Sequence, residues 1–126
     1  VFEDAYTLPH VLRQTRCVGT TSRGLYYYCW NSCGITATAQ GAELQMLLEA
    51  HLGAGMPFDD EYYMHLLNIQ MDVCELTGAA PRLPFRKVST VGHLSSSKLK
   101  LKAMVQNLIG INGICKINKV IHQLSR

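Results

Sequence analysis

Two pairs of side chains in this sequence have spacings that acid–base chemistry could use. Glu61 and His65 are one helical turn apart, and Glu49 is close to His51 along the chain. Cys33 with either histidine would form a thiol–imidazole pair. Such spacings more often give hydrogen bonds on a helix surface, and the sequence contains no nucleophile elbow or glycine-rich phosphate loop. We therefore expect no catalytic residues and no enzyme activity.

The cysteines are the other reactive side chains. Cys29 and Cys33 are separated by three residues, whereas zinc sites usually contain a C-x2-C pair. No histidine lies near enough in sequence to complete a zinc finger, so we expect neither a metal nor a cofactor. Five cysteines in a chain of 126 residues are typical of an oxidising compartment. They predict about two disulfides and one cysteine left over, which would allow a bond between chains. The candidates are Cys17, Cys29, Cys33, Cys74 and Cys115.

We expect Cys74 to pair with Cys115, because each lies in a strongly predicted helix and the bond would join the acidic and basic halves of the chain. Cys17 would then pair with Cys29 or Cys33. The sequence begins at Val1 without an initiator methionine, and we interpret it as a mature secreted protein after removal of a signal peptide.

Charge is divided sharply along the chain. Residues 1–75 carry all nine acidic residues and three bases, a net charge of −6, whereas residues 76–126 carry nine bases and no acid. Such asymmetry indicates an anionic partner. We expect the basic half to bind an anionic membrane or receptor surface through Arg82, Arg86, Lys87, Lys98, Lys100, Lys102, Lys116 and Lys119. The alternative is internal pairing with the acids Asp59, Asp60, Glu61, Asp72 and Glu75.

Three lysines begin the last predicted helix, where the positive end of the helix dipole makes cations unfavourable. Lys98, Lys100 and Lys102 therefore need an anion to compensate them. With Lys116 and Lys119 the segment resembles in composition a basic amphipathic helix that lies on anionic membranes. Nucleic acid is disfavoured, because the aromatic residues 26–30 are far in sequence from the bases.

Composition favours a globular protein with an apolar core, cavity or interface. Hydrophobic residues make up 48% of the chain and charged residues only 17%, against about 25% in typical soluble domains. No apolar run reaches the roughly 18 residues that span a bilayer. Five methionines could line a cavity for a small hydrophobic ligand, so a carrier is an alternative function. A subunit of a secreted assembly is a third.

The helices are predicted from apolar spacing and capping residues. We expect helices within residues 1–14, with Thr7 as N-cap, and over 40–52, 59–77 and from Ser95–Ser97 to the C-terminus. The last segment forms either two helices or one helix bent at Gly110–Gly113. Leu101, Met104, Val105, Leu108 and Ile109 form its apolar face. Pro81 and Pro84 exclude a helix between 79 and 92.

One domain over residues 1–126 is expected, because this length suits a single core. Its predicted fold class is mostly α: a compact bundle of four to five helices with an extended Tyr-rich segment near the N-terminus and about two disulfides. Leu66, Ile69 and Val73 should be nearly fully buried in a central helix. The function that we expect is that of a secreted interaction or toxin-like protein.

Overall fold

The protein is mostly helical, as predicted. The computed structural model describes residues 3–24, 33, 38–55 and 59–124, and over these ranges it has no strand. In chain order the elements are α1 (Glu3–Gln14), α3 (Gly41–Gly53), α4 (Asp60–Thr77), the short 3-10 helix η1 (Val91–His93) and α5 (Ser97–Leu124). The Tyr-rich segment at 25–30 lies outside the described residues.

Helix α4 is the centre of the fold and has the ends that its sequence predicts. The Asp59 carboxylate accepts a hydrogen bond from the Tyr62 amide at 2.7 Å, which caps the N-terminus. Gly78 ends the helix with a left-handed φ of 70°, and its amide donates to the Cys74 carbonyl. Glycine suits this position because it has no Cβ.

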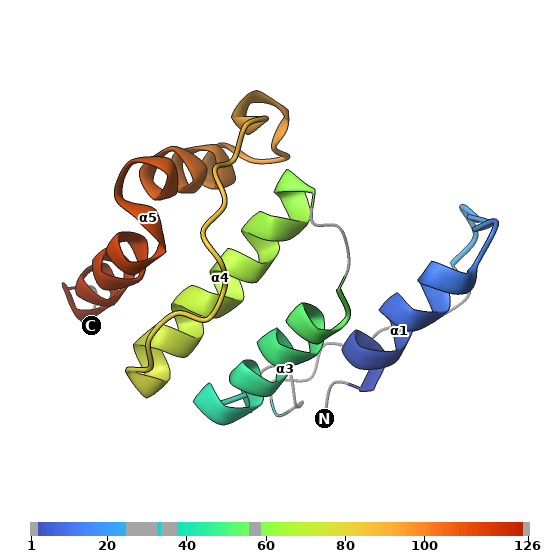
Figure 1. The fold of residues 1–126 in the computed structure, drawn as a ribbon, viewed down its shortest axis with the longest axis horizontal. Helices are drawn as coiled ribbons and strands as arrows, with labels where there is room; N and C mark the ends of the chain where they lie inside the picture. Colours follow the sequence, from blue (N-terminus) through green and yellow to red (C-terminus); the bar gives the residue numbers. More distant parts are fainter. Residues whose placement is uncertain (1–2, 25–32, 34–37, 56–58, 125–126) are drawn as a thin grey trace.

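Helix α4 buries apolar side chains on two of its sides, because helices pack against both of them. Helix α3 lies along one side and α5 along the other, while α1 lies beyond α3 (Figure 1). Leu66, Ile69 and Val73 are nearly fully buried, which confirms the prediction for them. Leu76, in the last turn of the same helix, is exposed.

Helix α3 matches its prediction, and α1 differs at its start. Leu48 is buried in the core, and Leu44, Leu47 and Leu52 pack against it. Helix α1 begins at Glu3 and not after Thr7, so the predicted cap at Thr7 is wrong. Asp4 in the first turn favours the earlier start, because an acidic residue there stabilises the positive end of the helix dipole.

A non-helical segment joins α4 to α5 and crosses back along α4. Residues 82–90, called the strap below, run between the two helices (Figure 1). The prolines keep the segment extended, as predicted. Two of its apolar side chains, Leu83 and Val88, enter the core.

Helix α5 is bent where its glycines predict. Gly110 has a φ of 71°, outside the helical region, so α5 consists of two limbs. A Cβ on Gly113 would lie 2.8 Å from the Ile109 side chain, so the bend also needs glycine there. None of the described helices combines the length and apolarity that crossing a membrane requires.

Candidate functional site

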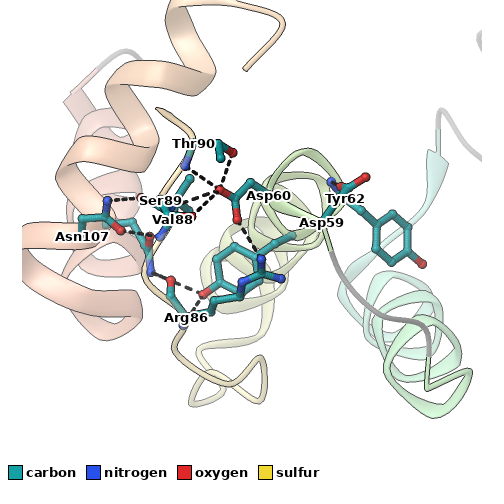
Figure 2. A network of polar contacts seen from close by, with 10 residues as sticks. Asp59, Asp60, Tyr62, Arg86, Val88, Ser89, Thr90 and Asn107 are labelled. Atoms are coloured by element: carbon teal, nitrogen blue, oxygen red, sulfur yellow. Dashed lines mark hydrogen bonds and ion pairs between the residues drawn. The ribbon is translucent and has the colours of Figure 1, made fainter. Parts of the chain in front are cut away.

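The strongest polar cluster is built on the buried carboxylate of Asp60, in the first turn of α4 (Figure 2). It accepts hydrogen bonds from the Thr90 hydroxyl at 2.5 Å and the Thr90 amide at 2.7 Å. The Ser89 amide donates to it at 3.1 Å, and Arg86 forms an ion pair at 2.9 Å. These hydrogen bonds, those of Thr90 foremost, lower the pKa of Asp60 despite its burial.

Three further side chains of α4 and α5 hold the backbone of the strap. Asn107 donates to the Val88 carbonyl and accepts from its amide, as Figure 2 shows. The buried Gln70 oxygen accepts from the amides of residues 82 and 83 at 2.7 and 2.9 Å. Gln106, also buried, donates to the Arg86 carbonyl at 2.9 Å. The cluster thus satisfies backbone groups that an extended segment would otherwise leave unpaired, so its role is structural.

Some bases of the C-terminal half contact side chains of α3 and α4. Arg86 is held by Asp60, and Arg82 forms an ion pair with the exposed Glu49. Lys102 donates from Nζ to the Asn68 side chain at 2.6 Å. Burial raises the pKa of Asp72, and the charge of Lys102 partly opposes this rise. Internal pairing therefore holds for the predicted binding residues Arg82 and Arg86, and Lys102 has a polar partner on α4.

Apart from Lys102, five of the predicted binding residues form no ion pair with any residue in the described part of the chain. One lies on the strap and four on α5: Lys87, Lys98, Lys100, Lys116 and Lys119. Lys100 is half-buried, and the other four are exposed. These cations are available to an external anion.

The predicted apolar face of α5 points mostly to solvent. The helix packs through other residues instead: Ala103, Gln106, Ile111, Ile114 and Cys115. Eight large apolar side chains are left exposed: Leu101, Met104, Leu108, Ile109, Ile117, Val120, Ile121 and Leu124. On each limb they recur at intervals of three and four residues, so each limb carries an apolar stripe.

Lysines flank these stripes. At 3.6 residues per turn, Lys98 and Lys100 lie on opposite sides of the stripe that contains Leu101 and Leu108. Lys116 lies beside the stripe of the second limb. The bend at Gly110 brings the two limbs around an apolar groove of about 260 Å³, bordered by Lys98 and Lys102. This face of α5 is the candidate functional site.

The acid–base pairs of the sequence do not form. Glu61 instead accepts hydrogen bonds from the Ser95 amide and hydroxyl. His65 packs against the ring of His51, whose Nδ1 lies 2.6 Å from the Tyr62 hydroxyl. Burial, and secondarily the charge of His65, lower the pKa of His51. This contact between α3 and α4 was not predicted, because helices distant in sequence bring its members together.

Cys74 and Cys115, the predicted partners, lie together as thiols. Both are buried, and they line one pocket of about 340 Å³ together with Lys116 and Lys119. Burial, followed by a hydrogen bond with the Cys74 side chain, raises the pKa of Cys115 to about 12. No disulfide joins any two described cysteines, so the two predicted disulfides are not confirmed. Cys17 and Cys33 are exposed, and Cys29 lies outside the described residues.

No group of three or more histidine, cysteine or acidic side chains among the described residues could hold a metal ion. Compared with known proteins, the chain matches no family model, no curated protein and no solved structure.

Proposed function

We propose that the protein is a secreted interaction or toxin-like protein that binds anionic membranes through the exposed face of α5. The observation that carries this proposal is the pair of solvent-facing apolar stripes with lysines beside them. Amphipathic helices of this kind lie in the membrane interface, where the apolar face enters the acyl boundary and lysines attract anionic lipids. A receptor is the other anionic partner that the charge allows, but the apolar stripes favour lipid.

The exposure of these apolar stripes supports the proposal that α5 contacts another surface when the protein functions. Leu108 and Leu124 are 84% and 83% exposed, and six more large apolar side chains of α5 are exposed with them. Soluble proteins rarely expose contiguous apolar patches of this kind outside interaction sites. The unpaired lysines add attraction to an anionic surface, worth about 1 kcal/mol each near the membrane.

Replacing both Lys98 and Lys100 with glutamine tests the electrostatic part of the proposal. We expect binding to vesicles of phosphatidylserine and phosphatidylcholine to weaken by about 2 kcal/mol at low salt, roughly thirtyfold. The difference from the unsubstituted protein should shrink as salt rises, because exposed charges are screened. Cosedimentation over a salt series, with circular dichroism to verify folding, measures this effect.

The matched control replaces Arg16 and Arg23 with glutamine. Both are exposed and lie outside α5, so the control has the same net charge as the lysine variant. It should retain most of the vesicle binding. If the two variants lose binding equally, total charge governs the interaction and α5 is not its site. If the lysine variant loses stability and no binding, the lysines act within the protein.

The carrier alternative has weaker support. A carrier requires an enclosed apolar cavity of some hundreds of Å³, whereas the apolar hollow on α5 is a groove at the surface. The exposed stripes would also suit the third alternative, a subunit of an assembly, through contact with another chain.

We also propose that the protein is extracellular and that Cys74 and Cys115 form a disulfide there, one of about two in the chain. Their burial together supports this pairing. Peptide mapping of protein from an oxidising medium, under non-reducing conditions, should recover the two cysteines in one linked peptide. Recovery of Cys74 as an alkylated thiol would contradict the pairing.

A further inference from the structure

The groove on α5 has the form of a binding site for one apolar chain. Its two sides come from the two limbs of α5, and Met71 of α4 contributes from the helix behind. The apolar side chains that line it are Met71, Leu101, Val105, Ile114, Ile117 and Ile121. Its volume of about 260 Å³ is just below the range of roughly 300–1,000 Å³ for drug-sized ligands, which suits a single acyl chain better than a two-chain lipid.

The charge at the border of the groove selects an anionic head group. Lys98 and Lys102 both line the groove. Lys102 already donates to Asn68, whereas Lys98 is exposed and has no ion pair in the described ranges. Lys98 also lies in the first turn of α5, where the helix dipole adds to its positive potential. A carboxylate beside Lys98 would offset both the charge of this lysine and the positive end of the helix dipole.

We propose that this groove binds a free fatty acid, with the acyl chain between the two limbs of α5 and the carboxylate on Lys98. The site goes beyond the proposed function, which concerns attachment to a membrane surface. It is located on the same face of α5, and a membrane is a source of such a ligand.

Isothermal titration calorimetry with dodecanoate, well below its micellar concentration, tests the site. We expect saturable binding of one dodecanoate per chain and much weaker binding of the zwitterionic dodecylphosphocholine. Lys98→Gln should weaken dodecanoate binding about fivefold. Lys116→Gln, which removes the same charge outside the groove, should leave the affinity within twofold.

A second pair of variants tests the apolar part of the site. Ile121 lines the groove, and Leu124 lies outside it on the same limb. Both are exposed, so neither substitution with glutamine should prevent folding. Ile121→Gln should weaken dodecanoate binding about tenfold, as expected for a polar group in an apolar site, and Leu124→Gln should leave it unchanged.

The failure of this site can be distinguished from the failure of the proposed function. Vesicle binding without saturable dodecanoate binding would overturn the site alone. Dodecanoate binding without vesicle binding would uphold the site and reject membrane attachment. Equal effects of Ile121→Gln and Leu124→Gln would overturn the site. So would a dimer in native mass spectrometry that Ile121→Gln dissociates, because the groove would then hold a second copy of the chain.

Discussion

Replacing Leu66 with alanine is expected to lower the free energy of unfolding by about 2–5 kcal/mol. Leu66 is fully buried in α4, the helix that contacts both α3 and α5. The substitution removes apolar contacts and leaves a cavity that the surrounding helices can fill only in part. Denaturation by urea, followed by circular dichroism, measures the change.

Leu76→Ala is the matched control, because Leu76 belongs to the same helix and is exposed. It should change stability by no more than about 0.5 kcal/mol. A loss below about 1 kcal/mol for Leu66→Ala would mean that α4 is peripheral, which would contradict the described fold.

Asp60→Ala is expected to destabilise the protein by about 3 kcal/mol. The substitution removes the buried acceptor for the Ser89 and Thr90 amides and the partner of Arg86. The exposed N-cap Asp59 accepts one described hydrogen bond, from Tyr62. Asp59→Ala should therefore cost only about 1 kcal/mol.

The contribution of Asp60 should also depend on pH. Because its folded pKa is lowered, the carboxylate stabilises the protein above its ordinary pKa of about 4, and this stability is lost as the pH falls through the folded pKa. Asp60→Asn should therefore show its deficit at neutral pH and approach the unsubstituted protein in acid. A deficit that stays constant from neutral pH to the acid transition would show that the charge of Asp60 does not anchor the strap.

The sequence predicts much of the fold because local signals determine it. Asp59 and Gly78 fix the ends of α4, and Gly110 fixes the bend of α5, as the capping and backbone rules require. The predicted cap at Thr7 was wrong: a threonine two residues before Pro9 suits an N-cap, but Asp4 favours an earlier start.

The polar interior could not be predicted, because it depends on contacts distant in sequence. Gln70 and Gln106 interrupt apolar stripes and give no local sign that they hold the strap. For the same reason, charge patterning could not show which bases Asp60 and Glu49 would pair with.

The apolar stripes of α5 show the limit of periodicity. Spacing predicts that Leu101, Met104 and Leu108 share one face of a helix, and it does not tell whether that face meets the core or the solvent. The helix packs through the smaller Ala103 and the polar Gln106. One signal in the sequence indicated that the apolar face of α5 could be exposed: the three closely spaced lysines beside it, Lys98, Lys100 and Lys102.

Paramagnetic relaxation by spin-labelled lipids tests membrane binding through α5 most directly. Anionic bicelles that carry a nitroxide in the acyl region should broaden the methyl NMR signals of Leu101, Leu108 and Leu124. Leu47 of α3, on the opposite side of α4, serves as an internal reference and should keep its signal. Broadening centred on α1 or α3, or none under conditions that saturate binding, would contradict the account.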